Sequence, residues 1–239
     1  MKNLPAVVYP HGGPRGYDRI SFDSFAQALA SAGYMVIQPQ FRGSSGFGAK
    51  HMTAGSGEWG RKMQDDITDT VKALSEKGLI DPQKVCIVGM SYGGYAALAG
   101  GAFTPDLYKC VVSINGVANL VDMYQHEKFE HGQHHEVVTY LEMQFAANAG
   151  GEVDKALMKA RSPDSHAANF VAPVLLIHGE NDKVVPFKQS ESMRAALHKH
   201  KKQVELIELK GDNHNLVNNE TSIAALRATV DFVNAHLKQ

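Results

Sequence analysis

The sequence predicts an α/β fold in which a mostly parallel β-sheet is covered by helices on both faces. Six short runs rich in β-branched residues alternate along the chain with segments of helical pattern. Several of these runs are apolar at every position, as expected for strands that helices bury on both sides. Such alternation is typical of parallel strands joined by crossover helices. The chain has 239 residues, and we expect one domain spanning residues 1–239.

The predicted strands are the β-branched runs at residues 6–9, 34–38, 85–88, 110–114, 174–178 and 204–209. The predicted helices lie between or after them, at residues 22–32, 63–76, 92–103, 187–198 and 222–237. In the second helix, Ile67, Val71 and Leu74 have the spacing of one buried face. Gly33 and Gly78 stand where these first two helices should end in a left-handed residue.

One long stretch, at about 116–169, breaks the alternation because it contains no convincing strand. A polar, histidine-rich segment at 125–136 leads into a predicted helix at 137–147. We interpret the stretch as an insertion over the edge of the sheet where the strands end. Insertions of this kind commonly line substrate sites.

The composition excludes several classes of partner. The chain has 24 basic and 25 acidic side chains, so neither nucleic acid nor an anionic membrane is an expected partner. No apolar run is long enough to span a membrane. Residues 1–5 contain no apolar signal region, which favours the cytoplasm but leaves the compartment open. Cys86 and Cys110 lie inside apolar runs, and we interpret them as small core residues that form no disulfide framework or metal site.

The turn between the third predicted strand and the next helix, residues 89–94, reads G-M-S-Y-G-G. The pattern G-x-S-x-G in this setting is typical of a nucleophile elbow, which presents a strained serine at the edge of the sheet. Gly89 and Gly93 remove side chains that would clash in so sharp a turn. Ser91 is therefore the candidate nucleophile. The alternative is a glycine-rich turn in which Ser91 has no chemical role.

A serine hydroxyl needs a base, and the base needs an acid that orients it. On this type of sheet the expected chain order is serine, acid, histidine, at the ends of successive strands. Asp182 follows the fifth predicted strand and His214 follows the sixth. Glu180 and Asp212 are rival acids that we rank below Asp182. Ordinary loop positions for the aspartate and the histidine are the alternative.

The negative oxygen that develops during acyl transfer requires N–H donors. One is expected from Tyr92, directly after the candidate nucleophile. The other is expected from the loop after the first strand, where residues 11–14 read H-G-G-P. Glycine there lets bare backbone approach a substrate. An ordinary Gly-Pro turn is the alternative.

With these motifs in order along nearly the whole chain, the sequence resembles the catalytic domain of the prolyl oligopeptidase family of serine peptidases, which has an α/β-hydrolase fold. The matching stretches are residues 11–14, 41–48, 89–94, 178–186 and 211–214. Within them, residues 42–48, R-G-S-S-G-F-G, matter most for separating this family from plain esterases. The resemblance is to the branch that contains acylaminoacyl peptidases and dipeptidyl peptidases.

The resemblance implies that Ser91, Asp182 and His214 form a catalytic triad. It also implies an oxyanion hole made by the backbone of Gly13 and Tyr92. In some relatives a tyrosine hydroxyl on the first loop serves instead, and Tyr9 is that alternative here.

By the same resemblance, an apolar pocket for the residue before the cleaved bond is lined by Tyr92, Val117, Leu120, Met123 and Val185. Strict proline cleavers tend to carry tryptophan near the position of Leu120, and some acylaminoacyl peptidases carry arginine where this chain has Val184. The subtype is therefore open.

Family members usually carry an N-terminal β-propeller over the site, together with further strands, and only residues 1–5 precede the first strand here. We therefore expect this chain to be the catalytic part of a longer protein, with a propeller as its partner domain. A homo-oligomer is left open.

We expect no cofactor and no metal. His126, His131, His134 and His135 occur in a polar segment that is more typical of a solvated surface than of a zinc site. Residues 43–48 resemble a phosphate-binding loop but lack its Gly-Lys-Ser/Thr ending.

The function expected from these residues is hydrolysis of short peptides through an acyl-enzyme intermediate. A carboxylesterase on the same fold is the second hypothesis, because the triad does not distinguish esters from amides. A catalytically silent binding module is the third, although such a module has no need for the full set of Ser91, Asp182 and His214.

Overall fold

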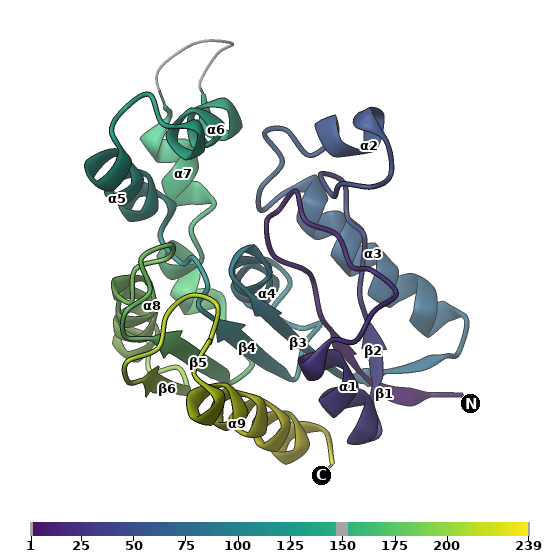
Figure 1. Ribbon diagram of the computed structural model, residues 1–239. Coiled ribbons are helices and arrows are strands. Elements are labelled where there is room, and N and C mark those ends of the chain that lie inside the picture. Colours follow the sequence, from purple (N-terminus) through teal and green to yellow (C-terminus); the bar gives the residue numbers. More distant parts are fainter. Residues whose placement is uncertain (1, 147–152, 239) are drawn as a thin grey trace.

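The computed structural model of this chain describes residues 2–146 and 153–238, and one six-stranded sheet runs through it (Figure 1). Its strands are β1 (Leu4–Val8), β2 (Met35–Ile37), β3 (Ile80–Met90), β4 (Cys110–Ile114), β5 (Val174–Gly179) and β6 (Val204–Leu209). Their order across the sheet is β2-β1-β3-β4-β5-β6, and all neighbouring strands run parallel. The predicted parallel sheet is confirmed, and every predicted strand is present.

The helices are α1 (Ser24–Ser31), α2 (Ala49–Thr53), α3 (Lys62–Glu76), α4 (Tyr92–Phe103), α5 (Leu120–His131), α6 (Glu136–Phe145), α7 (Lys155–Ala160), α8 (Lys188–Lys199) and α9 (Asn219–Leu237), with a 3₁₀ segment at Pro163–Asn169. Gly33 and Gly78 follow α1 and α3 with φ of 100° and 65°, which confirms the predicted left-handed ends. Among the described residues, no helix combines the length and apolar character needed to cross a membrane.

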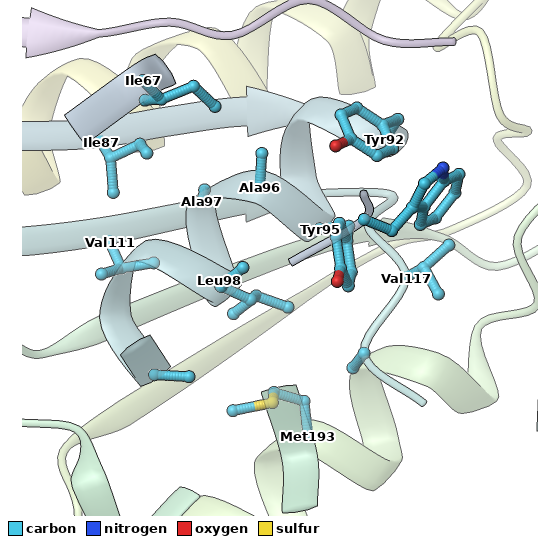
Figure 2. Packing of buried hydrophobic residues seen from close by; sticks show 14 of the residues in the cluster. Ile67, Ile87, Tyr92, Tyr95, Ala96, Ala97, Leu98, Val111, Val117 and Met193 are labelled. Atoms are coloured by element: carbon cyan, nitrogen blue, oxygen red, sulfur yellow. The ribbon is translucent and has the colours of Figure 1, made fainter. Parts of the chain in front are cut away.

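Successive strand residues point to opposite faces of the sheet, and each face carries its own buried cluster. On one face Val8, Ile87 and Val111 pack with residues of α3, α4 and α8. Figure 2 shows part of this cluster and labels Ile87, Val111 and Leu98 of α4 among its members. On the other face Val7 and Val88 pack with α1 and α9. Helices therefore cover both faces, as predicted.

The stretch 116–169 is more helical than expected. Helices α5, α6 and α7 gather in the upper left of Figure 1, apart from the helices that cover the sheet. The first half of the histidine-rich segment belongs to α5, a helix that was not predicted. Leu120, Met123, Tyr124 and Glu127 form the buried side of α5, and the charged Glu127 hides that periodicity in the sequence. The predicted helix at 137–147 is found as α6, except that residue 147 lies outside the described residues.

The cysteines differ from the expectation in one respect. Both are fully buried, as predicted, but Cys86 and Cys110 are joined by a disulfide. The interpretation that they form no disulfide was wrong. The reason lies in the register of two neighbouring strands, which places Cys86 of β3 opposite Cys110 of β4 with their Cα atoms 4.8 Å apart. That register is set by the tertiary fold and is not visible in either strand alone.

Candidate active site

Ser91 lies at the turn between β3 and α4, in a backbone conformation that residues other than glycine rarely adopt. Its φ is 60° and its ψ is −123°. A Cβ on Gly89 would lie 2.2 Å from the carbonyl oxygen of Gly93, and a Cβ on Gly93 would lie 2.1 Å from that of Pro10. Both glycines are therefore required by close backbone contacts. The turn has the geometry of a nucleophile elbow.

Three side chains form a continuous hydrogen-bonded chain at the ends of β3, β5 and β6. Nε2 of His214 lies 3.0 Å from Oγ of Ser91. Nδ1 of His214 lies 2.7 Å from Oδ2 of Asp182. Because a carboxylate only accepts, the histidine donates its Nδ1–H to Asp182, which leaves Nε2 free to accept the Ser91 hydroxyl proton.

The Asp182 carboxylate is buried and receives several donors. Its Oδ1 accepts the backbone N–H groups of Val184 and Val185, both at 2.8 Å. Oδ2 accepts from His214 and lies 3.4 Å from Nε2 of His178. Burial on its own would raise the pKa of Asp182, but hydrogen bonds from His178, His214 and Val185 outweigh it and lower that pKa below the ordinary value. The group therefore stays ionised and oriented toward His214.

The two rival acids have other partners. Glu180 accepts the N–H of Gly211 at 2.9 Å and pairs with Lys210 at the surface. Asp212 is buried, accepts the N–H of Asn213 at 2.8 Å, and binds the hydroxyl of Thr221. Each of these carboxylates organises the loop after β6 without a hydrogen bond to the His214 ring.

The first loop runs beside the elbow. A Cβ on Gly12 would lie 3.5 Å from Cβ of Ser91, so the loop backbone passes directly against the serine. His11 anchors this loop, because its Nε2 is 2.7 Å from Oγ of Ser44 and its ring stacks on Phe41. The stretch 41–48 thus supports the first loop. The Tyr9 side chain packs on Phe25 in the buried cluster against α1 and α9.

The side chains expected to line a substrate pocket lie in one buried cluster, on the face of the sheet covered by α3, α4 and α8. They are Tyr92, Val117, Leu120, Met123 and Val185, and each is less than a tenth exposed. Tyr92 and Val117 gather at one end of this cluster together with Tyr95 (Figure 2). The Tyr92 ring also meets Trp59 edge-on, with ring centroids 4.5 Å apart. The sequence reasoning did not single out Trp59, because nothing near it in the chain points to the site.

Two contacts within the histidine-rich segment involve His131. Nε2 of His131 lies 3.5 Å from Glu127, and the rings of His131 and His135 stack at 4.5 Å. No cluster of three or more His, Cys, Asp or Glu side chains suited to a metal occurs within residues 2–146 and 153–238.

Two buried polar residues at the base of the site were not predicted. His178, the fifth residue of β5, hydrogen-bonds through Nδ1 with the Ser190 hydroxyl at 2.7 Å and donates through Nε2 to the Val185 carbonyl at 2.8 Å. Asn115, directly after β4, has a positive φ of 47°. The available signal was a polar residue at the carboxyl end of an apolar strand, which is where sites on parallel sheets form.

Comparison with known proteins shows the family to which the chain is similar. A family model described as "Prolyl oligopeptidase family" matches residues 20–239. "Dipeptidyl peptidase family member 6" of Caenorhabditis elegans is 36% identical over 194 residues, which cover 81% of this chain and 26% of that protein. "Dipeptidyl aminopeptidase BIII" of Pseudoxanthomonas mexicana is 33% identical over 239 residues, which cover 96% of this chain and 33% of that protein. Acylamino-acid-releasing enzymes are also among the matches.

The fold comparison agrees with the family match. A puromycin-hydrolysing peptidase from Mycobacterium tuberculosis aligns with a TM-score of 0.90 and 29% identity, over 99% of this chain and 35% of that one. Of the two curated relatives named above, this chain spans between a quarter and about a third of the length.

Proposed function

Because this chain belongs to the prolyl oligopeptidase family of serine peptidases and has its α/β-hydrolase fold, we propose that it hydrolyses short peptides through a covalent acyl-enzyme. The observation that carries the proposal is the unbroken hydrogen-bonded chain from Ser91 through His214 to Asp182. In this proposal Ser91 is the nucleophile, His214 the general base and Asp182 the orienting acid.

The first half of the proposed reaction forms the acyl-enzyme. Nε2 of His214 takes the hydroxyl proton as Oγ of Ser91 attacks the carbonyl carbon of the peptide bond. The carbonyl oxygen becomes negative and accepts the backbone N–H groups of Tyr92 and Gly13. When the tetrahedral intermediate collapses, the C–N bond breaks and the proton on Nε2 passes to the leaving amine.

The second half releases the acyl group. Water replaces the departed amine, and His214 removes one of its protons while the oxygen attacks the acyl carbon. The ester bond to Ser91 then breaks, and the proton returns to the serine oxygen. Asp182 stabilises the charged imidazole in both halves and remains ionised, in keeping with its low pKa.

For the substrate side chain we propose an apolar pocket built from Tyr92, Val117, Leu120, Met123 and Val185. The assignment follows the family to which the chain belongs, and all five side chains lie in one buried cluster. Met123→Ala should enlarge the pocket and shift preference toward bulkier apolar residues before the cleaved bond. A library of peptides that differ only at that residue measures the shift.

The length of the relatives supports a further proposal about access. The matched region is about a third of the Pseudoxanthomonas relative, so most of that protein lies outside the match. We propose that in the longer proteins of this kind a covering domain, a β-propeller, restricts substrates to short peptides. The restriction to short peptides would then belong to the longer proteins, and this chain assayed alone should accept long peptides as well as short ones. A sharp length cut-off for the chain alone would contradict the proposal.

The direct test of the proposed chemistry is covalent labelling. A fluorophosphonate should react once per molecule, and peptide mapping should place the adduct on Ser91. Turnover of matched peptide amides and esters then compares peptidase with esterase activity. An unlabelled Ser91, or turnover of esters with none of amides, would contradict the proposed function.

A further inference from the structure

The carboxyl end of β4 contacts all three parts of the candidate active site. The carbonyl oxygen of Ile114, its last residue, accepts the N–H of Ser91 at 2.9 Å. The next residue, Asn115, donates its own N–H to the carbonyl of Ile177 in β5 at 2.8 Å. Strand β4 lies between β3 and β5 in the sheet, so this position is adjacent to the elbow and to the acid loop.

The Asn115 side chain joins the acid loop to the histidine loop. Its Oδ1 accepts the N–H of Gly179, the last residue of β5 and three positions before Asp182, at 2.9 Å. Its Nδ2 donates to the backbone carbonyl of His214 at 2.8 Å. The Asn115 side-chain amide therefore holds both the start of the loop that carries Asp182 and the backbone of His214.

Asparagine is the side chain that meets both requirements of this position. The residue is fully buried with φ of 47°, a left-handed conformation that asparagine tolerates better than most residues. The hydrogen bonds to Gly179 and to His214 require one acceptor and one donor on the same short side chain. Aspartate supplies only acceptors when ionised, and glycine tolerates the backbone but supplies neither group.

The loop that carries Asp182 and the loop that carries His214 also contact each other, so a shift of one loop would move the other. The N–H of Asn181 donates to the carbonyl of Asp212 at 2.8 Å. A Cβ on Gly179 would lie 2.8 Å from the carbonyl oxygen of Asn213. These contacts hold the loops to one another, whereas Asn115 ties both of them to the strand beside Ser91.

We propose that Asn115 is a positioning residue that sets the distance and angle of His214 relative to Ser91. This inference rests on the proposed function, because it assumes that Ser91 is the nucleophile. The amide touches no reacting atom and acts through the backbone of His214 and Gly179. Its loss should therefore lower the rate of the chemical step without changing how substrate is bound.

The test compares Asn115→Gly and Asn115→Asp with the wild-type chain. Glycine keeps the left-handed backbone and removes both side-chain bonds, and aspartate keeps the acceptor toward Gly179 and loses the donor toward His214. A small misplacement of a catalytic group can cost about 100-fold in rate, so we expect kcat and the fluorophosphonate labelling rate to fall about 10- to 100-fold in both variants. KM should stay within about twofold, since substrate binding is untouched.

Val112→Ala is the matched control, because Val112 is equally buried on β4 but faces the cluster against α1 and α9. It should lose stability while its labelling rate per folded molecule stays within about twofold of wild type. A wild-type chain that is labelled on Ser91, beside Asn115 variants labelled equally fast, overturns this inference and leaves the proposed function standing. Equal slowing of Val112→Ala overturns it as well. A wild-type chain that is not labelled on Ser91 overturns both.

Discussion

His214 and Asp182 are 32 residues apart, yet Nδ1 of one lies 2.7 Å from Oδ2 of the other. The pairing arises because β5 and β6 are adjacent parallel strands whose carboxyl ends open at the same edge of the sheet. Two N–H groups from Val184 and Val185 hold the other carboxylate oxygen. The acid therefore presents a fixed oxygen to the histidine without help from a substrate.

Ser91→Ala should fold normally and lose activity by about 10⁴- to 10⁶-fold in kcat, because triad members act as a unit. Initial rates on a peptide substrate measure the loss, and circular dichroism checks the fold. Retention of more than a few per cent of wild-type turnover would exclude Ser91 as the nucleophile.

Asp182→Asn should reduce kcat by about 10⁴-fold, because an amide no longer fixes the histidine tautomer or stabilises its charged form. Glu180→Gln is the matched control, since Glu180 is a neighbouring carboxylate whose hydrogen bond goes to Gly211. It should change kcat by less than about threefold. The reverse ranking in a kcat comparison would assign the acid role to Glu180.

Acid should weaken the fold partly through Asp182. Its pKa is lower in the folded chain than in the unfolded one, where an aspartate has a value of about 4. Its contribution to stability is therefore complete above that unfolded value and is lost as the pH falls through the folded value. Urea unfolding from about pH 5 down to about pH 2 should show a shallower pH dependence for Asp182→Asn than for wild type.

Asp106→Asn, which changes an exposed aspartate, is the control for that experiment. Its pH dependence should match that of the wild-type chain. If Asp182→Asn also matches the wild type, the lowered pKa of Asp182 has no part in acid stability.

Gly93→Ala should destabilise the fold by about 3 kcal/mol or more, because the new Cβ would lie 2.1 Å from the carbonyl oxygen of Pro10. To relieve this clash, either the turn at Ser91 or the chain just after β1 would have to move, and each packs against the other. At Gly12 the nearest atom to an added Cβ is 3.4 Å away, so Gly12→Ala is a milder change. Equal losses of unfolding free energy for the two variants would contradict this account of the elbow.

Removing the Cys86–Cys110 disulfide should lower the unfolding free energy by about 3 kcal/mol, because the cross-link restricts the unfolded chain over a separation of 24 residues. Cys86→Ala/Cys110→Ala and wild type refolded under reducing conditions should both lose this amount. Peptide mapping without reductant should find the two cysteines linked. Two free thiols in the native chain would contradict the pairing.

Local patterns predicted the strands and the elbow because those features depend on residues close in sequence. Apolar β-branched runs mark strands buried on both faces, and Gly89 and Gly93 mark a turn that few other residues can form. The chain order of Ser91, Asp182 and His214 followed from a rule about strand ends. It selected three residues that the fold brings into one hydrogen-bonded chain.

Features that depend on contacts between residues far apart in the sequence, or that a charged residue conceals, were missed. The disulfide requires that Cys86 lie opposite Cys110, which is a matter of register between β3 and β4. Helix α5 escaped prediction because Glu127 occupies a buried position of its apolar face. Asn115 escaped because its partners, Gly179 and the backbone of His214, are 64 and 99 residues away.

The disulfide belongs to the cluster that α1 and α9 cover. Both cysteines are fully buried there, beneath side chains that include Phe232 and Val233 of α9. Helix α9 comes after both cysteines in the chain, and the Tyr34 hydroxyl near α1 donates a hydrogen bond to Asn234 across 200 residues. Until that helix docks, this face of the sheet is open to oxidants. We therefore expect the disulfide to form before α9 docks, after which the same packing shields the bond from reductants.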